Sequence, residues 1–248
     1  MTTPQLLRKE LKVIDVKQET PTIKSVALAI GGIHFQYVSG QYAGITLDAA
    51  QPDEKGNVRA FSLASSPTEK GKLIVAARQR KSTFKQAFFE LKEGDTVKVS
   101  GPFGRLALHE NYHREAVMLC GGIGITPLRS MLVYATDEKL PLKITLFYSN
   151  RTPEEIAFKS ELYELQRRNK NLNVVYMITR PDETALSWSG RIGRIDSELV
   201  KEYVGDMKEA VFYICGPSAM VKEMLDILSV FSIPVERIRV ENFTGYES

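Results

Sequence analysis

Residues 119–127, with the sequence LCGGIGITP, hold residue types that let a backbone come close to a ligand. Gly121, Gly122 and Gly124 follow an apolar run and precede a helical pattern. Glycine lacks a Cβ, so its backbone can approach a phosphate, and a helix N-terminus offers unpaired N–H groups to an anion. Pro127 suits the first turn of a helix because its missing N–H is not needed there. The stretch predicts a strand-to-helix turn that either binds a phosphate or packs tightly without a ligand.

This turn matches only part of the G-x-G-x-x-G dinucleotide motif, since Pro127 stands where the third glycine would be. The next apolar run ends in YSNRT, with Asn150 and Arg151 where an acidic residue would bind a ribose 2′-hydroxyl. The turn alone therefore does not identify a dinucleotide site.

The composition is that of an ordinary globular protein, with 43% hydrophobic and 25% charged residues among 248. A net charge of +3 without a dense Lys/Arg block gives no reason to expect nucleic-acid binding. The N-terminus lacks the apolar core of a signal peptide, and no apolar run approaches the length of a membrane span. We therefore expect no membrane span and a cytoplasmic location.

Few side chains are available as metal ligands. Cys120 and Cys215 are far apart in the sequence, and the three histidines follow no metal-binding spacing. We expect no metal site, so any redox chemistry must come from an organic cofactor.

The N-terminal part of the chain has a β-rich pattern. Up to about residue 109, short β-rich segments are separated by Gly, Pro and Asp, and one helical segment, 82–91, interrupts them. The expected strands include 25–30, 44–49, 73–77 and 96–100. Many short strands with a single helix predict a small antiparallel β-barrel, which we assign to residues 1–109.

Residues 110–248 have a different, alternating pattern. The expected strands are 116–120, 144–148, 174–178 and 211–215, with a closing strand at Ile238 and Val240, and the expected helices are 127–134, 153–168, 197–203 and 219–230. Apolar strands alternating with amphipathic helices predict an α/β doubly wound parallel sheet covered on both faces. In such a sheet the first strand-to-helix turn, here residues 121–124, commonly meets a phosphate.

Further motifs occur along the chain in a fixed order. They are SGQYAGI (39–45), RAFSLAS (59–65), GPFG (101–104), GGIGITP (121–127) and CGP (215–217). Together they resemble the ferredoxin–NADP⁺ reductase superfamily of flavin-dependent oxidoreductases, over roughly Lys12 to Tyr246. The resemblance implies a barrel that carries FAD, a second domain that carries NADPH or NADH, and a cleft where the two rings meet.

The family motif R-x-Y-S corresponds to Arg59, Ala60, Phe61 and Ser62. The resemblance implies that Arg59 pairs with a flavin phosphate and that Phe61 lies against the isoalloxazine ring. It also implies a catalytic hydroxyl at Ser62, near flavin N5. Because Phe61 replaces the family's tyrosine, stacking is kept and one hydrogen bond is lost. The alternatives are a surface charge at Arg59 and a core residue at Phe61.

A second implied flavin contact is a strand followed by a helix N-terminus under the diphosphate. The residues that match it are Val75, Ala76, Arg78, Ser82, Thr83, Phe84 and Lys85. Ser82 or Thr83 would cap the helix, and its N–H groups with the Lys85 ammonium would suit a diphosphate, which favours FAD over FMN. The alternative is an ordinary amphipathic helix with solvated lysines.

For the nucleotide domain, the resemblance implies a pyrophosphate turn and a nicotinamide site after the fourth strand. The matching residues are Gly121, Gly122, Gly124, Thr126 and Pro127 for the turn, and Cys215, Gly216 and Pro217 for the nicotinamide. Cys215 would be a catalytic residue that leaves room for the ring, or else core filling. Asn150, Arg151 and Arg180 would meet the adenosine end, where cations without an Asp or Glu favour NADPH over NADH.

The C-terminal residues include two aromatic side chains, Phe243 and Tyr246. The resemblance implies that Tyr246 covers the flavin face that the nicotinamide must reach, as a catalytic residue, with Phe243 behind it. The alternative is a frayed tail.

As a whole, the resemblance implies hydride transfer from NAD(P)H to bound FAD and delivery of electrons to a separate acceptor such as ferredoxin or flavodoxin. Arg78, Arg80, Lys81 and Lys85 would form a basic rim able to steer an acidic carrier protein. The alternative is a non-catalytic flavin- and nucleotide-binding subunit, with an electron-transfer or regulatory role in a larger complex.

Overall fold

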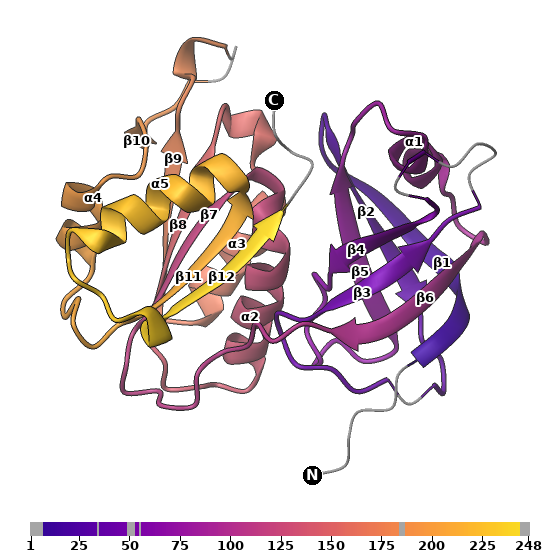
Figure 1. Cartoon of the computed structure of the whole chain (residues 1–248), viewed down its shortest axis with the longest axis horizontal. Helices are drawn as coiled ribbons and strands as arrows, with labels where there is room; N and C mark the ends of the chain where they lie inside the picture. Colours follow the sequence, from indigo (N-terminus) through magenta and orange to yellow (C-terminus); the bar gives the residue numbers. More distant parts are fainter. Residues whose placement is uncertain (1–6, 34, 49–52, 55, 184–186, 244–248) are drawn as a thin grey trace.

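The computed structural model describes residues 7–33, 35–48, 53–54, 56–183 and 187–243. Over these residues the chain forms two β-sheets that lie side by side, one from its N-terminal part and one from its C-terminal part (Figure 1). The division into domains at residues 109 and 110 stays a prediction.

The first sheet is antiparallel and curls into a barrel. Its strands in the described ranges are β1 (Leu7–Thr20), β2 (Ile23–Ala29), β3 (Tyr42–Thr46), β4 (Val58–Ser62), β5 (Lys72–Arg78) and β6 (Thr96–Phe103), in the order β4-β3-β6-β1-β2-β5. Ala64 N donates a 2.8 Å hydrogen bond to Ile74 O, which brings the residues after β4 to β5. The first and last strands of the sheet order therefore meet, and the predicted antiparallel fold is confirmed.

Helix α1 (Thr83–Glu90) packs on this barrel. Phe84 and Phe88 lie four residues apart on one face of the helix, and both are buried in the barrel core. Ser82 is the N-cap, because its Oγ accepts a 3.3 Å hydrogen bond from Lys85 N. The helix therefore begins with its N-terminus held at a fixed place beside β5.

The second sheet is parallel throughout the described residues. Its strands are β7 (Ala116–Gly121), β8 (Ile144–Asn150), β9 (Leu172–Ile178), β10 (Arg191–Ile192), β11 (Val211–Pro217) and β12 (Ile238–Phe243), in the order β10-β9-β8-β7-β11-β12. The strand order reverses between β7 and β11. In a sheet of this kind, ligands bind at such a switch point, outside the carboxyl ends of the strands.

Helices cover both faces of this sheet (Figure 1). The helices are α2 (Ile125–Asp137), α3 (Lys159–Arg168), α4 (Ser197–Tyr203) and α5 (Ser218–Ser229). Leu128 of α2 and Leu162 of α3 belong to one buried cluster, whereas Leu199 of α4 and Met224 of α5 belong to another. The doubly wound arrangement predicted for this part of the chain is confirmed.

One predicted helix, 153–168, is shorter in the structure. Residues Pro153–Glu155 form a 3₁₀ turn, and α3 begins only at Lys159. Phe158 has a φ of 56° and is buried against Arg129, whose Cζ lies 5.4 Å from the ring centroid. The left-handed conformation of Phe158 interrupts the helix, and its ring lies in the core.

A buried arginine joins the two domains. Arg129 of α2 is 4% exposed, and its Nη1 donates to Ala64 O at 2.7 Å and to Glu69 Oε2 at 2.6 Å, both on the barrel side. Its Nε donates to Glu161 Oε2 of α3 at 2.9 Å. Removing one partner from such a buried pair costs about 3–5 kcal/mol, so this contact fixes how the domains sit against each other.

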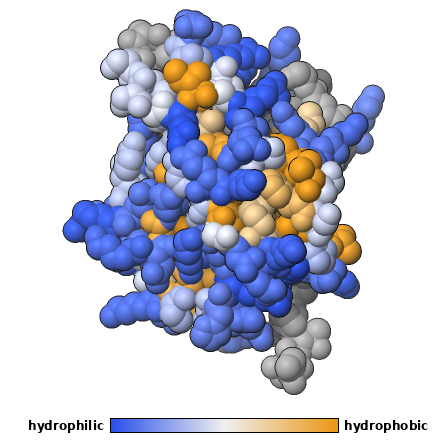
Figure 2. Space-filling view, turned by 90° about the vertical axis from the view of Figure 1, so that its left-hand side faces the viewer, coloured by the Kyte–Doolittle hydropathy of each residue, from blue (hydrophilic) through white to orange (hydrophobic). Residues whose placement is uncertain are grey.

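The face of the second domain farthest from the barrel is mostly hydrophilic, with its largest group of apolar side chains right of centre and smaller groups elsewhere on the face (Figure 2). Among the residues that the structure describes, no helix has the length and apolar character needed to cross a membrane.

Candidate active site between the two domains

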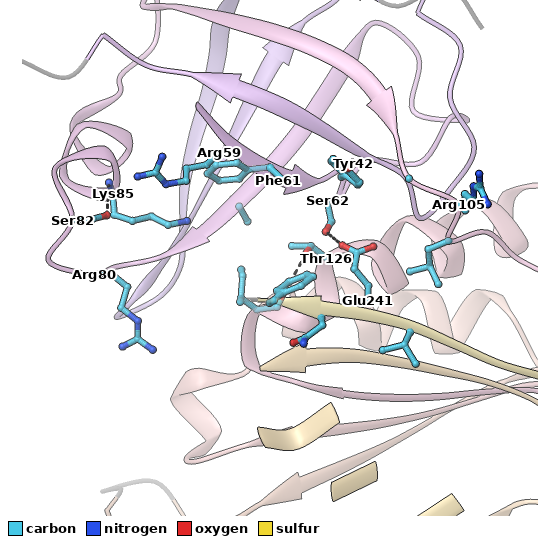
Figure 3. A pocket seen from close by; sticks show the side chains of 18 of the residues that line it. Tyr42, Arg59, Phe61, Ser62, Arg80, Ser82, Lys85, Arg105, Thr126 and Glu241 are labelled. Carbon is cyan, nitrogen blue, oxygen red and sulfur yellow. Dashed lines mark hydrogen bonds between the residues drawn. The ribbon is translucent and has the colours of Figure 1, made fainter. Parts of the chain in front are cut away.

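A cavity of about 1350 Å³ lies between the barrel and the second sheet, and both domains line it (Figure 3). Its barrel side includes Tyr42, Asp53, Arg59, Ala60, Phe61, Ser62, Ala76, Arg80, Ser82 and Lys85, and its other side includes Ile123, Thr126, Arg239, Val240, Glu241, Asn242 and Phe243. The cavity thus brings the ends of β4 and β12 together with the start of α2.

Ser62 and Glu241 meet across this cavity. Ser62, the last residue of β4, donates its hydroxyl hydrogen to Glu241 Oε1 on β12, and the two side chains point toward each other (Figure 3). Burial raises the pKa of Glu241 to about 7, and the hydrogen bond from Ser62 opposes this rise. Glu241 can therefore hold or release a proton near neutral pH.

The sequence analysis missed Glu241. Its sequence signal was weak: Glu241 directly follows the closing strand expected at Ile238 and Val240, and only the structure pairs it with Cys215 of the CGP motif on the neighbouring parallel strand. A carboxylate on a strand beside that motif could have marked a polar wall of the cavity.

Arg59 lines the cavity, as expected for a phosphate-binding residue, and it already holds an anion. Its Nη2 pairs with the carboxylate of Asp53, and its Nη1 donates to Gly56 O at 2.8 Å. The guanidinium lies over the Phe84 ring, 5.1 Å from the centroid. An anionic ligand at Arg59 would have to compete with the Asp53 carboxylate.

Phe61 lies in the barrel core, which the sequence analysis gave as the alternative to a ring against the isoalloxazine. It is 4% exposed, its ring stacks on Phe88 at 5.1 Å, and Lys85 Nζ lies 4.5 Å from its centroid. The ring is part of the barrel core, because α1 covers it. Phe61 also lines the cavity, so a ligand there can contact it.

The second predicted flavin segment divides between the cavity and the core. Ala76, Ser82 and Lys85 line the cavity, whereas Val75 and Phe84 are buried in the barrel core. The Thr83 hydroxyl is buried with no hydrogen-bond partner among the described residues. Burial and the nearby cations Arg59 and Arg80 lower the pKa of Lys85 to about 8, so an anion placed here would be stabilised by three positive groups.

Arg78 does not line the cavity, and it is buried and so not part of an exposed basic rim. It is 9% exposed, and its Nη1 donates to Glu155 Oε2 of the second domain at 3.1 Å and to Thr22 Oγ1 at 3.0 Å. Its guanidinium packs on Gly122 of the glycine turn. The end of β5 thus directs Arg78 toward the second domain.

The glycine turn is packed directly on β11. A Cβ at Gly124 would overlap the carbonyl oxygen of Cys215 and lie 2.7 Å from its carbonyl carbon, and Gly122 has a φ of +52°. Thr126 Oγ1 donates a 3.1 Å hydrogen bond to Ile123 O within the turn. Gly121 is the last residue of β7, and Pro127 lies buried in the first turn of α2. Ile123 and Thr126 reach the cavity.

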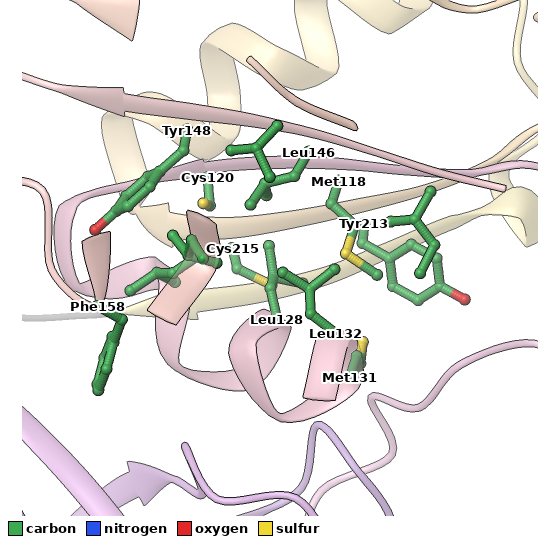
Figure 4. Close-up of a cluster of buried hydrophobic side chains, with 14 of the residues drawn as sticks. Met118, Cys120, Leu128, Met131, Leu132, Leu146, Tyr148, Phe158, Tyr213 and Cys215 are labelled. Carbon is green, nitrogen blue, oxygen red and sulfur yellow. The ribbon is translucent and has the colours of Figure 1, made fainter. Parts of the chain in front are cut away.

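Cys215 is not brought to the cavity. Its side chain is fully buried in the cluster that also holds Cys120 and Met118 (Figure 4), and burial raises the pKa of its thiol. Gly216 and Pro217 complete β11 without lining the cavity either. Of the C-terminal aromatic pair, Phe243 lines the cavity, and Tyr246 lies outside the described residues.

The residues predicted for the adenosine end carry carboxylate partners. Arg151 Nη2 pairs with Glu155 Oε1 at 2.8 Å, and Arg180 Nη1 pairs with Glu183 Oε1 at 3.1 Å. Asn150, the last residue of β8, is buried. The preference for NADPH depended on cations without an acidic neighbour, whereas in the structure both arginines have a carboxylate partner, so this argument for NADPH is weakened.

Two family models match the chain: the oxidoreductase FAD-binding domain over residues 10–108 and the oxidoreductase NAD-binding domain over residues 118–226. NADH-cytochrome b5 reductase 2 of Meyerozyma guilliermondii is 30% identical over 193 residues, which is 75% of this chain and 65% of that protein. One component of the Na⁺-translocating NADH-quinone reductase of Serratia proteamaculans is 28% identical over 76% of this chain and 49% of its own length. The chain thus spans about half to two thirds of these curated relatives.

Solved structures are similar over nearly the whole chain. A ferredoxin NADP⁺ reductase of Neisseria gonorrhoeae with bound FAD and NADP has a TM-score of 0.79 at 25% identity, covering 95% of this chain and 98% of that one. The Amycolatopsis cytochrome P450 reductase GcoB has a TM-score of 0.83 at 21% identity, covering 98% of this chain and 72% of that one, which shows the shared fold. With a FAD-binding barrel, an NAD-binding parallel sheet and a cavity between them, the chain belongs to the ferredoxin–NADP⁺ reductase superfamily of flavoprotein oxidoreductases.

Proposed function

We propose that the chain takes a hydride from a nicotinamide dinucleotide onto FAD in the cavity between its domains and passes the electrons to a separate acceptor. One observation carries the proposal: a single cavity is lined by the flavin motif of the barrel and by the turn of the nucleotide domain, with Ser62 and Glu241 in contact across it.

The cavity fits the two ligands in size and in charge. Its volume is about 1350 Å³, whereas a pocket for one small ligand usually measures about 300–1,000 Å³. On the barrel side Arg59, Arg80 and Lys85 offer three cations beside the capped start of α1, which suits a diphosphate. On the other side Ile123 and Thr126 present uncharged side chains next to the switch point, and Arg239 and Glu241 add one cation and one carboxyl group.

FAD bound there would supply the hydride acceptor at N5 and would release electrons singly or in pairs. The chain's own residues orient the reaction and handle the proton. Ser62 holds its hydroxyl hydrogen toward Glu241, and Glu241 can exchange a proton near pH 7. The pair would hold a proton where the barrel and β12 face each other across the cavity.

The acceptor is proposed to be an acidic electron carrier such as ferredoxin or flavodoxin. Arg80 and Lys81 are exposed beside the cavity and can attract a negatively charged protein. The similarity to an NADH-cytochrome b5 reductase makes cytochrome b5 a further carrier to test.

Anaerobic titration of the FAD-loaded chain with NADH and with NADPH, followed by the visible flavin spectrum, tests the reductase. Bleaching by at least one nucleotide is expected. Bound FAD that neither nucleotide bleaches would contradict the proposal and favour the non-catalytic subunit. Mixing the reduced protein with ferredoxin, flavodoxin and cytochrome b5 in turn then tests the acceptor, and oxidation by none of them would refute a separate carrier of this class.

A further inference from the structure

Three charged side chains, Arg78, Arg151 and Glu155, form a cluster beside the glycine turn. Glu155 Oε2 accepts hydrogen bonds from Arg78 Nη1 at 3.1 Å and from Arg151 Nε at 3.3 Å, while Arg151 Nη2 lies 2.8 Å from Glu155 Oε1. One carboxylate is therefore shared by two guanidinium groups, one from the barrel and one from the nucleotide domain.

The position of this cluster relative to the turn is fixed by buried contacts. A Cβ built on Gly122 would lie 3.0 Å from Arg78 Nη2, so Arg78 packs directly on the turn. Tyr148, which is fully buried, donates its hydroxyl hydrogen to Gly122 O at 2.9 Å and accepts a 3.2 Å hydrogen bond from Ala157 N. Both links hold the segment that carries Glu155 at a constant distance from Gly122.

The topology brings this segment to the adenosine half of a dinucleotide. When the pyrophosphate lies on the turn after β7, the adenosine ribose lies over the end of the neighbouring strand. That strand is β8, which ends at Asn150, and Arg151 and Glu155 follow directly. The side chain of Arg151 is 49% exposed and that of Glu155 is 16% exposed, so the carboxylate is the more firmly positioned of the two.

The two nicotinamide dinucleotides differ at this ribose. In NADH a 2′-hydroxyl can donate a hydrogen bond to a carboxylate, whereas in NADPH a 2′-phosphate with a charge of about −2 needs an uncompensated cation. Glu155 offsets the charge of Arg151 and would itself repel the phosphate.

We propose that Glu155 makes the nucleotide site select NADH over NADPH, a role that rests on the proposed reductase function. Arg151 alone would favour the 2′-phosphate, and Glu155 reverses that preference by holding its guanidinium and by presenting a carboxylate to the ribose. The neighbouring loop repeats this arrangement of an arginine with a carboxylate partner. Arg180 N donates a 2.8 Å hydrogen bond to Arg151 O, and the Arg180 side chain pairs with Glu183.

The ratio of kcat/KM for NADH to that for NADPH, measured on the FAD-loaded chain, tests this role. The unaltered chain is expected to prefer NADH by about tenfold or more, and Glu155→Gln should move the ratio toward NADPH by about tenfold. Glu155→Asp keeps the charge and should keep the NADH preference. Glu164→Gln, which removes the partner of Arg167 on α3, is the matched control and should leave the ratio unchanged.

A double variant tests whether Arg151 is responsible for the higher kcat/KM with NADPH that is expected in Glu155→Gln. In Glu155→Gln/Arg151→Ala the improvement with NADPH should disappear, because no freed guanidinium is left to bind the 2′-phosphate. An NADPH preference in the unaltered chain, or a ratio that Glu155→Gln does not change, would overturn the proposal.

Binding without turnover separates this proposal from the reductase function. Adenosine 2′,5′-bisphosphate and AMP differ only in the 2′-phosphate, and calorimetry on the full chain compares them. Glu155→Gln should tighten the bisphosphate by about tenfold, whereas AMP, which loses a carboxylate partner for its 2′-hydroxyl, should not bind more tightly. If neither dinucleotide bleaches the flavin but this shift is seen, the reductase proposal fails and the role of Glu155 stands. If bleaching occurs without the shift, the role of Glu155 fails alone.

Discussion

The two walls of the cavity are built from different chemistry. On the barrel wall, Arg59 and Lys85 present charged side chains, and Asp53 supplies a carboxylate to Arg59. The wall of the nucleotide domain includes Ile123 and Thr126 of the glycine turn. Behind them, Gly122 packs on Arg78 and Gly124 packs on the Cys215 carbonyl. The barrel wall can adjust, since long side chains change partners, whereas the turn has no room for an added atom.

This difference predicts different responses to mutation. A substitution on the barrel wall should change the affinity for the bound ligand by about the free energy of one charge pair, and it should leave the fold intact. A change in the turn should displace backbone, because a carbonyl group cannot rotate away as a side chain does.

Gly124→Ala should have the largest effect. The added Cβ would overlap the Cys215 carbonyl, so either the turn or β11 must move, at a cost of about 1–3 kcal/mol or more. We expect a lower Tm and a loss of flavin reduction by NADH, with FAD still bound because the barrel is untouched. Calorimetry and the anaerobic titration measure both effects.

Gly205→Ala is the matched control, since an added Cβ there has nothing within 4 Å. An unchanged rate of flavin reduction in Gly124→Ala would show that the turn does not position the nucleotide.

Arg59→Ala should have the next largest effect, confined to FAD affinity. Loss of a charge-assisted pair should weaken FAD by about 2 kcal/mol, or roughly 30-fold in Kd. Arg59→Lys should fall between, because lysine keeps the charge but not the two-point geometry. Flavin fluorescence measures the Kd, and Arg8→Ala, exposed on β1, is the control. Equal FAD affinity in all four proteins would reject a phosphate-binding role for Arg59.

Glu241→Gln should change the pH dependence of stability. Burial raises the pKa of Glu241 from 4.5 to about 7, so between these values the folded chain holds a proton that the unfolded chain releases. The free energy of unfolding should therefore fall as the pH rises through this range and level off above about pH 7. The fall is at most about 3 kcal/mol, and less because the carboxyl is partly exposed.

The glutamine variant should lack this fall, and its steady-state rate should lose any step near pH 7. Thermal unfolding from about pH 4 to about pH 8 tests the first expectation, with Glu110→Gln as an exposed control. A variant whose unfolding keeps the pH dependence of the unaltered chain would place the titrating group elsewhere.

Much of the fold could be predicted because its signals are local. The apolar runs at β7, β8 and β11 and the glycines after β7 each read directly as strands and a turn. The break before α3 could not be predicted, since the left-handed conformation of Phe158 depends on the buried site beside Arg129 that its ring fills.

The site was less predictable, because its main contacts join residues far apart in the sequence. Ser62 meets Glu241 only when β4 and β12 face each other, and Arg78 meets Glu155 only when the two domains are in place. The sequence pattern marks Phe61 as aromatic but does not show that Phe88 of α1 will cover it. Local sequence patterns therefore predicted many of the residues that line the cavity. They did not predict the side chains that those residues contact.

Cys215→Ser should have the smallest effect on the site, although the motif implied a catalytic role. Cys215 and Cys120 are both fully buried and pair in register on β11 and β7, so Cys120→Ser is a closely matched control. Each variant buries a hydroxyl in an apolar cluster, at a cost of about 1–3 kcal/mol in unfolding free energy. Thermal unfolding should show similar losses for the two, and the rate of flavin reduction by NADH should change little in either. If Cys215→Ser slowed reduction while Cys120→Ser did not, the Cys215 thiol would have to reach the nicotinamide, which requires β11 to move toward the cavity when the nucleotide binds.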